Sequence, residues 1–157
     1  MEHEKCIICS SMKLKKLNDY LKGNMFKCQN CGFIFASKIP TEKELLEHYE
    51  GYGRNDYLSP ITVKRYNEIL DSFEKYRKKN NLIDVGAGIG LFAEVAKERG
   101  WNVYGTEYTN EAIEICRKKG IKMQGGKLNP DNYNPAFFDV ITSFEVIEHI
   151  NNPVEEM

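Results

Sequence analysis

The sequence predicts an α/β fold for residues 81–157, with a small cysteine-rich module at 1–39 and a helical connector at 40–80 before it. Four short apolar strands are predicted near 82–85, 102–106, 121–123 and 138–143. A glycine-rich loop follows the first of them, and amphipathic helical segments separate the strands, which is typical of a parallel sheet. The cysteines fall mainly in two close pairs near the N-terminus, which sets the first module apart.

Four of the five cysteines form two Cys-x-x-Cys pairs, Cys6 with Cys9 and Cys28 with Cys31, with eighteen residues between the pairs. This spacing matches a zinc ribbon, in which the two pairs direct four thiolates at one ion. Gly32 follows the second pair, where a tight turn is expected. A disulfide or a redox motif is the alternative, but a reducing compartment and the doubled spacing favour zinc. Such a small module builds little core, so we expect the metal to supply its folding energy.

Two helices are predicted in the connector. Thr41 and Glu44 have the spacing of a capping box, and the apolar face that follows them continues to Gly51. A second helix is predicted over about 61–79. Its buried stripe consists of Val63, Tyr66, Ile69, Leu70 and Phe73.

The glycine-rich loop after the first strand predicts a binding site for an anionic group. Gly86, Gly88 and Gly90 are spaced two apart, and glycine lets the backbone approach a ligand closely. The next helix presents free N–H groups and its positive dipole end there, and Gly100 lies where its left-handed C-cap is expected. Glu107 follows the second strand at about the 20-residue offset at which a carboxylate meets ribose hydroxyls. A solvated loop acid is the alternative for Glu107.

The fifth cysteine, Cys116, has a different setting. It lies on the inward stripe of a helix predicted over about 110–119, together with Ala112 and Ile115. A thiol in such a position behaves as a small apolar side chain. We therefore expect Cys116 to be buried and chemically inert.

The glycine spacing also indicates a family. The run from Asp84 to Gly90 reads Asp-x-Gly-x-Gly-x-Gly, which differs from the dinucleotide fingerprint and resembles motif I of the class I S-adenosylmethionine-dependent methyltransferases. Residues 103–107 look like the second-strand motif of that family, and 138–150 look like its fourth-strand motif. The resemblance extends over about residues 82–153. It implies a Rossmann-like sheet with strand order 3-2-1-4.

The resemblance implies a cofactor site. S-adenosylmethionine is expected to bind through Asp84, Gly86, Ala87, Gly88, Gly90, Glu107, Tyr108, Glu145 and Tyr57. The cofactor has no phosphate, so the helix end and the loop amides would face its methionine carboxylate. Tyr57 is included because aromatic residues ahead of motif I help to cover the cofactor or acceptor in the family, although packing is the alternative.

His149 and Glu148 are the expected catalytic residues. Methyl transfer needs an aligned acceptor and, for a weak nucleophile, a base. The ordinary pKa of histidine suits that role, and in similar sugar-methylating enzymes the Glu-His pair at this place is linked to catalysis. In many other relatives the same pair is structural, which is the alternative here.

The resemblance stops early. A helix predicted to begin at Asn152 has barely started when the sequence reaches Met157, whereas the family's sheet normally adds three more strands. We therefore expect an incomplete sheet whose fourth strand is an exposed edge, with Phe138, Val140 and Ile141 losing much of their cover. Exposed edges invite pairing, so self-association through this strand is expected. The first four loops make most of the family's cofactor site, which can therefore survive.

Composition restricts the compartment and the partners. The 157 residues carry a formal net charge of −1. No apolar run approaches the ~20 residues of a membrane helix, and the N-terminus lacks a signal-peptide core. We expect a cytoplasmic protein with no membrane partner. The near-neutral charge provides no general basic surface, which disfavours nucleic acid.

Three functional hypotheses follow. The first is methylation of a small molecule, such as a nucleotide-linked sugar or glycan precursor. The second is methylation of rRNA or tRNA, with the zinc module gripping the substrate. The third is a non-catalytic fragment that binds the cofactor and a partner. The sequence does not identify the methyl acceptor.

Overall fold

The computed structural model describes residues 1–20, 24–41, 43–44 and 57–156, which form two units. The first unit contains the described residues up to Glu44 together with 148–156, and the second contains 57–147. Each unit has a buried core of its own. The chain therefore consists of two separately packed parts.

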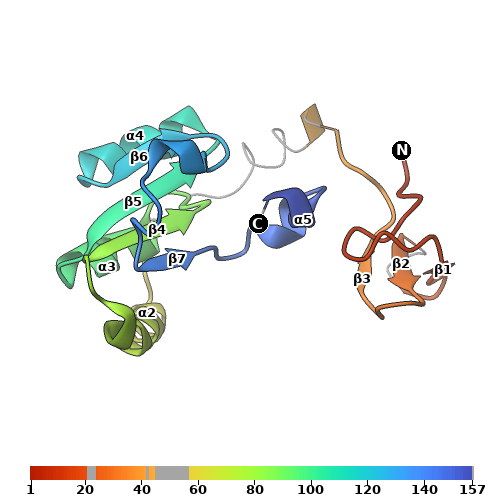
Figure 1. Ribbon diagram of the computed structural model, residues 1–157, viewed down its shortest axis with the longest axis horizontal. Coiled ribbons are helices and arrows are strands. Elements are labelled where there is room, and N and C mark those ends of the chain that lie inside the picture. Colours follow the sequence, from red (N-terminus) through yellow and green to blue (C-terminus); the bar gives the residue numbers. More distant parts are fainter. Residues whose placement is uncertain (21–23, 42, 45–56, 157) are drawn as a thin grey trace. The chain divides into compact units, whose positions relative to one another are not determined.

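The first unit is built around a small antiparallel sheet (Figure 1). Its strands, in the order β1-β2-β3, are β1 (Leu14–Lys16), β2 (Met25–Cys28) and β3 (Ile34–Ala36). The short helix α5 (Pro153–Glu156) belongs to the same unit. The buried core consists of Cys6, Cys28 and Phe35. Two of these three residues are cysteines, so little apolar area stabilises the unit without them.

The helix predicted from Thr41 begins as expected. The Thr41 N–H donates to Glu44 Oε2 over 2.9 Å, and the Glu44 N–H donates to Thr41 Oγ1 over 3.2 Å. These reciprocal bonds are those of a capping box, which confirms the predicted start of the helix. The continuation to Gly51 and its apolar face lie outside the described residues.

The second unit contains a parallel sheet of four strands (Figure 1). They are β4 (Asn81–Val85), β5 (Asn102–Glu107), β6 (Lys122–Gly125) and β7 (Val140–Thr142). Their spatial order, β6-β5-β4-β7, confirms the predicted order 3-2-1-4. The loops that follow β4 and β5 therefore meet at one edge of the sheet.

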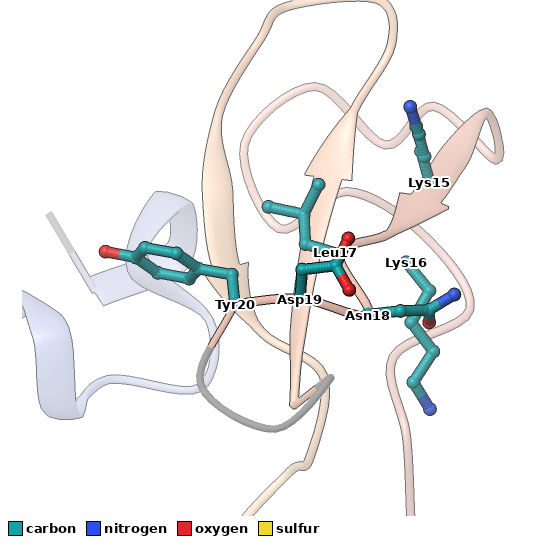
Figure 2. A pocket seen from close by; sticks show the side chains of 6 residues that line it. All are labelled: Lys15, Lys16, Leu17, Asn18, Asp19 and Tyr20. Carbon is teal, nitrogen blue, oxygen red and sulfur yellow. The ribbon is translucent and has the colours of Figure 1, made fainter.

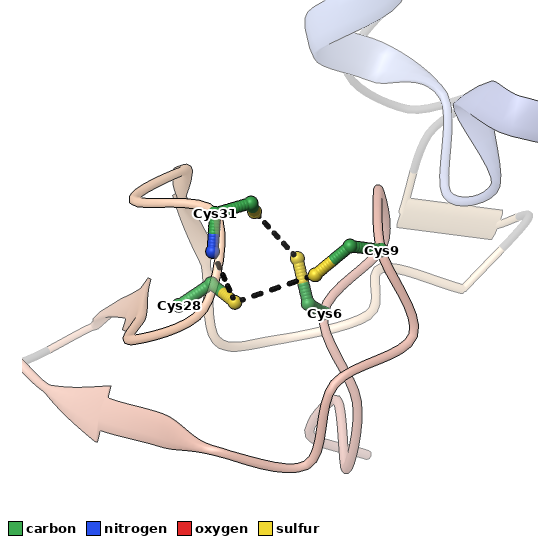
Figure 3. A group of neighbouring side chains, drawn as sticks. All are labelled: Cys6, Cys9, Cys28 and Cys31. Atoms are coloured by element: carbon green, nitrogen blue, oxygen red, sulfur yellow. Dashed lines mark hydrogen bonds between the residues drawn. The ribbon is translucent and has the colours of Figure 1, made fainter.

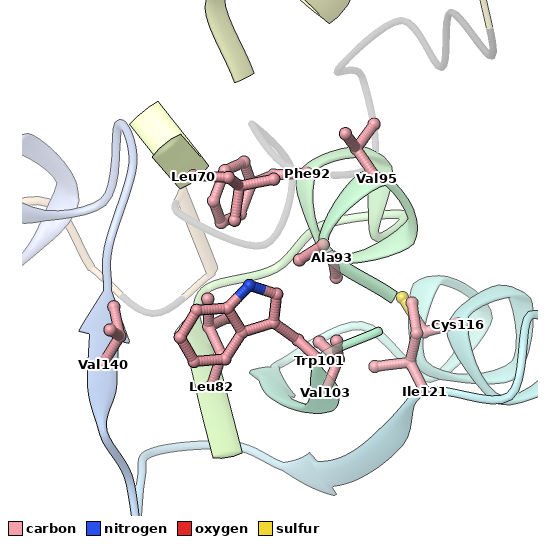
Figure 4. Packing of buried hydrophobic residues seen from close by; sticks show 11 residues of the cluster. Leu70, Leu82, Phe92, Ala93, Val95, Trp101, Val103, Cys116, Ile121 and Val140 are labelled. Atoms are coloured by element: carbon pink, nitrogen blue, oxygen red, sulfur yellow. The ribbon is translucent and has the colours of Figure 1, made fainter. Parts of the chain in front are cut away.

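Three helices pack on one face of this sheet. They are α2 (Pro60–Phe73), α3 (Leu91–Glu98) and α4 (Asn110–Lys118). The core between them and the strands, drawn in Figure 4, consists of Leu70, Leu82, Phe92, Ala93, Val95, Ala96, Trp101, Val103, Cys116, Ile121 and Val140. The predicted burial of Cys116 is thus confirmed. Every helix in the described part of the chain is too short or too polar to cross a membrane.

The helix predicted over 61–79 is shorter than expected. It starts at Pro60, where Ser59 Oγ accepts the Thr62 N–H over 3.1 Å and caps the helix one residue before the predicted start. It ends at Phe73 and passes into the 3-10 helix η2 (Glu74–Tyr76). The apolar stripe at its centre was therefore predicted better than either end.

Asp139 explains why the helical path does not continue toward residue 80. Its Oδ2 accepts backbone N–H bonds from Lys78, Lys79 and Asn80 at 2.9, 2.7 and 2.7 Å. Asn80 has a φ of 68°, a left-handed conformation that right-handed helices do not contain. Desolvation opposes ionisation of Asp139, but these donors outweigh it and lower its pKa. The carboxylate thereby joins the entry of β4 to the entry of β7.

The opposite face of the sheet carries an aromatic cluster. Tyr104 pairs in register with Ile83 on β4. Tyr133, Phe137 and Phe138 pack around Tyr104 and one another, with ring centroids between 4.7 and 6.0 Å apart. Their rings help to bury Ile83, which is completely inaccessible to solvent.

The edge strand β7 is only partly uncovered. Val140 is 8% exposed because it faces the helices, so the expectation that it loses its cover is wrong. Phe138 is half-buried in the aromatic cluster, which also differs from that expectation. Ile141 points to the opposite face from Val140 and is 61% exposed, as predicted. The uncovered apolar surface of β7 is thus centred on one side chain.

Candidate functional site

Four cysteine side chains meet in the first unit (Figure 3). The Sγ atoms of Cys6, Cys9, Cys28 and Cys31 all lie within 4.8 Å of one another. The separations Cys6–Cys31 and Cys9–Cys28 are both 3.6 Å, and all four thiols are free. Sulfur atoms bound tetrahedrally to one zinc ion stand about 3.8 Å apart. The cysteines grouped by their spacing therefore come together in an arrangement that fits a four-coordinate ion.

Backbone N–H groups point at the sulfur of Cys28. Cys31 and Asn30 donate to it over 3.5 and 3.4 Å, and these bonds, that of Cys31 first, lower the pKa of the Cys28 thiol to about 6. The Asn30 side chain also donates to Cys9 Sγ over 3.6 Å. Gly32 has a φ of 79°, as the predicted tight turn requires. The thiolate is the metal-binding form, so this turn suits a bound cation.

The three glycines of the loop after β4 all have positive φ, with 74° at Gly86, 54° at Gly88 and 76° at Gly90. A Cβ on Gly86 would lie 2.4 Å from Val146 Cγ2, and a Cβ on Gly90 would lie 2.8 Å from Cys116 Sγ. A Cβ on Gly88 would meet nothing within 4 Å. Packing therefore requires the outer two glycines, while Gly88 presents an open side where a ligand can approach the backbone.

Hydrogen bonds join this loop to the end of β5. The Thr106 carbonyl accepts the N–H groups of Gly86 and Ala87 over 3.1 and 2.9 Å. The Gly88 N–H donates to Glu107 Oε2 over 3.0 Å. The sequence predicts one site for the loop and Glu107, and the structure brings them into direct contact. This place, at the carboxyl ends of adjacent parallel strands, is where α/β sheets bind ligands.

Glu107 has more protein partners than the sequence indicated. Its Oε1 accepts the N–H groups of Tyr108 and Thr109 over 2.7 and 3.1 Å, in addition to the Gly88 bond at Oε2. An ionised carboxylate has about four acceptor sites, so capacity remains for a ligand hydroxyl. The Tyr108 side chain is 62% exposed next to it. Glu107 is therefore held in place before any ligand arrives.

Asp84 is buried within the sheet and is only 4% exposed. Thr142 Oγ1 donates to Asp84 Oδ1 over 2.7 Å and thereby links β4 to β7. Desolvation raises the pKa of Asp84 to about 6, while the Thr142 bond opposes the shift. Its expected part in cofactor binding stays a prediction.

The other predicted site residues lie in different settings. Tyr57 is 68% exposed, and Glu145 is exposed with a φ of 53°. Glu148 and His149 belong to the 3-10 helix η4 (Ile147–His149) and pack with the first unit. The catalytic role of this pair therefore stays a prediction.

Tyr66 has surroundings that its helical spacing did not reveal. Its ring packs edge-to-face on Phe92, with centroids 5.2 Å apart. Burial raises the pKa of its hydroxyl, and Asp84 and Glu145 add to the shift through their negative charges. The predicted apolar stripe of α2 therefore includes a phenol close to carboxylates of the predicted site.

Residues 1–39 of the first unit carry an excess of positive charge. A hollow of roughly 420 Å³ lies beside β1. Its lining side chains, drawn in Figure 2, are Lys15, Lys16, Leu17, Asn18, Asp19 and Tyr20. Lys15 stands directly opposite Lys27 on β2, and like charges in such a pair are destabilising. Residues 1–39 contain seven lysines and three acidic residues, a net charge of +4. The near-neutral total charge of the chain conceals this local excess.

Comparison with known proteins adds three findings. A family model described as a methyltransferase domain matches residues 56–157. The ubiquinone biosynthesis O-methyltransferase of Azoarcus sp. (strain BH72) is 32% identical over 79 residues, covering 46% of this chain and 34% of that protein. The protein of the same name from Aliivibrio fischeri (strain MJ11) is 28% identical over 104 residues, covering 62% and 44%. The chain thus spans less than half the length of these curated relatives.

Two solved structures share the fold. CalS10, an amino pentose methyltransferase from Micromonospora echinaspora solved with S-adenosylmethionine bound, gives a TM-score of 0.50 at 18% identity, covering 76% of this chain and 48% of that chain. Monomeric WbdD gives the same TM-score and identity, covering 70% and 29%. At such identities the likeness concerns the fold, and it confirms the predicted α/β architecture.

Proposed function

Because this chain belongs to the class I S-adenosylmethionine-dependent methyltransferases, we propose that it binds S-adenosylmethionine at the glycine loop and transfers the methyl group to a small-molecule acceptor. The bond between Gly88 and Glu107 is the observation that carries this proposal, because it joins the two predicted halves of the cofactor site. The names of the matching proteins, for ubiquinone biosynthesis and for an amino pentose, favour a small acceptor. We propose a nucleotide-linked sugar or glycan precursor.

Each part of the cofactor has a proposed place. Its ribose hydroxyls bind Glu107, and its methionine carboxylate meets the open side of Gly88 and the N-terminus of α3. Asp84, Gly86, Ala87 and Gly90 form the frame of the loop. Tyr57, Tyr108 and Glu145 contact the cofactor at the rim of the site.

The bound cofactor supplies a methyl group on a cationic sulfur. An acceptor aligned with this sulfur would form its bond to the methyl carbon as the bond from that carbon to sulfur broke. An acceptor hydroxyl or amine loses its proton in this step. We propose that His149 takes that proton, with Glu148 beside it in sequence.

Glu107→Ala should weaken binding of S-adenosylmethionine about tenfold or more. A hydrogen bond to a charged group contributes about 1.5–3 kcal/mol, and this substitution removes the carboxylate from both the ribose and the loop. Calorimetric titration with S-adenosylmethionine measures the effect. Glu107→Gln keeps the shape of the side chain without its charge. Its affinity for S-adenosylmethionine should lie between those of Glu107→Ala and the parent protein. Tight binding of NAD with no binding of S-adenosylmethionine would overturn the proposal.

We also propose a structural zinc ion bound by Cys6, Cys9, Cys28 and Cys31. A closed site of four thiolates leaves no coordination position for a substrate, so the ion stabilises the first unit and takes no part in methyl transfer. Four free thiols also suit a reducing compartment, which supports a cytoplasmic location.

RNA is a second candidate acceptor. The facing lysines Lys15 and Lys27 on the first unit favour it. If RNA binds there, Lys15→Glu should weaken binding several-fold, and the parent's affinity should fall steeply between 50 and 200 mM salt. Fluorescence anisotropy with a labelled single-stranded RNA measures both effects. Lys118→Glu, an exposed charge reversal on α4, is the matched control. Equal effects of the two variants would show that RNA does not bind at this surface.

Cofactor binding without methylation of any acceptor would instead favour a non-catalytic role for the chain.

Self-association through β7 is proposed for the 157-residue chain. Ile141 is the exposed apolar side chain of this edge strand, so Ile141→Lys should oppose pairing by placing a charge in the new interface. Light scattering over a range of concentrations should show a larger mass for the parent than for the variant. A parent that remains monomeric at high concentration would contradict the proposal.

A further inference from the structure

The peptide groups around Gly88 are held from two sides by side chains of different elements. On one side, the Gly88 N–H donates to Glu107 Oε2 over 3.0 Å. On the other side, Cys116 Sγ donates to the Gly88 carbonyl oxygen over 3.2 Å. Glu107 ends β5 and Cys116 lies in α4, so two elements fix the one loop glycine whose Cα side is open.

The Cys116 thiol is suited to act as a donor. It is completely buried, and desolvation raises its pKa to about 11, so it keeps its proton at neutral pH. Gly90 leaves the space that the sulfur occupies, since a Cβ there would lie 2.8 Å from it. The geometry gives this thiol a defined partner, beyond the inert packing expected from the helical stripe.

The direction of one carbonyl fixes the direction of the next amide. In a trans peptide the C=O and the following N–H point in opposite directions. When Cys116 holds the Gly88 carbonyl, the Ile89 N–H is therefore directed to the other side of the loop. The structure gives this amide no partner within the described part of the chain, and Ile89 is half-buried there.

We infer that Cys116 is a positioning residue for the cofactor loop. By fixing the peptide between Gly88 and Ile89, it directs the Ile89 N–H outward, where it can donate to the cofactor's carboxylate. A donor fixed in advance binds an anionic group at a lower entropic cost than one that must reorient. This inference rests on the proposed function of the loop.

The matched variants Cys116→Ala and Cys116→Ser test the inference, because they differ only in a hydroxyl donor. Titration calorimetry with S-adenosylhomocysteine should show affinity reduced about three- to tenfold for Ala, the range expected for one hydrogen bond, and within about twofold of the parent for Ser. Urea unfolding followed by Trp101 fluorescence should give the two variants similar stabilities, because the bond from the serine hydroxyl to the Gly88 carbonyl offsets the burial of that hydroxyl and the higher helix propensity of alanine. A loss of affinity that only parallels a loss of stability would assign Cys116 to packing alone.

Amide hydrogen exchange in the cofactor-free protein provides a second measurement. The Gly88 amide, which donates to Glu107, should exchange several-fold faster in the Ala variant than in the Ser variant. Equal affinities and equal exchange rates for the two variants would overturn the inference. A parent that binds no S-adenosylhomocysteine would refute the proposed function instead, and the exchange rates would then decide whether Cys116 fixes the loop.

Discussion

Replacing Cys28 with serine is expected to abolish stoichiometric zinc binding and to unfold the first unit while the second stays folded. Structural zinc contributes on the order of 10 kcal/mol to small modules, and a core of Cys6, Cys28 and Phe35 offers little to replace it. Elemental analysis should give one zinc per parent chain and none per variant chain. Amide NMR spectra report the unfolding. The chain's single tryptophan, Trp101, is buried in the second unit, so its fluorescence should not change.

Cys116→Ser is the matched control for this experiment. Its thiol belongs to the core of the second unit and is not one of the four clustered cysteines, so the variant should retain its full zinc content. Purified parent without stoichiometric metal would end the zinc proposal. Dispersed amide signals from the first unit of Cys28→Ser would show that the metal is not needed for folding.

Asp84→Asn should change how the stability of the second unit depends on pH. The native pKa of Asp84 is about 6, above the ~3.9 of an unfolded aspartate. Between these values the native state binds a proton that the unfolded chain has released, so the unfolding free energy falls as pH rises from about 4 to about 6. A difference of about two pKa units corresponds to about 3 kcal/mol. Asparagine does not titrate, so the variant should lose most of this decline.

Urea unfolding between pH 4 and 7.5, followed by Trp101 fluorescence, measures this effect in the second unit alone. Asp139→Asn is the control of opposite sign. Folding lowers the pKa of Asp139, so its contribution to the unfolding free energy is complete at pH values above its pKa in the unfolded chain. This contribution is lost only as the pH falls through the pKa of Asp139 in the native state. The Asp139 variant should therefore lose stability at neutral pH. The same decline in Asp84→Asn as in the parent would show that Asp84 titrates like a solvated carboxylate.

Local sequence patterns predicted the features that depend on neighbouring residues. The strand, the glycines from Gly86 to Gly90 and the amphipathic helix after them form one continuous motif, so the loop followed from the sequence. Parallel strands place successive loops at one edge, and this made the meeting of the loop with Glu107 predictable as well. The spacing of the cysteines likewise predicted which four of them cluster in the structure.

Features set by distant residues were missed. Residues 78–80 are not helical, although the sequence predicts a helix up to 79, but donate to Asp139, about 60 residues later in the chain, and no local pattern indicates such a partner. Val140 stays covered because helices pack on its face of the sheet, although the strand lies at an edge. Cys116 has the helical spacing of a packing residue, and its bond to Gly88 depends on how α4 meets the loop.

The bonds accepted by Asp139 also bear on the order in which the second unit assembles. Contacts that enclose more chain have a larger loop-closure cost and tend to form later. The pairing of Leu82 with Val103 encloses far less chain than the pairing of Leu82 with Val140 or the bonds from Asp139. We therefore expect the sheet to grow outward from β4 and β5. Its last strand to dock, β7, would then be the first to detach when the unit begins to open.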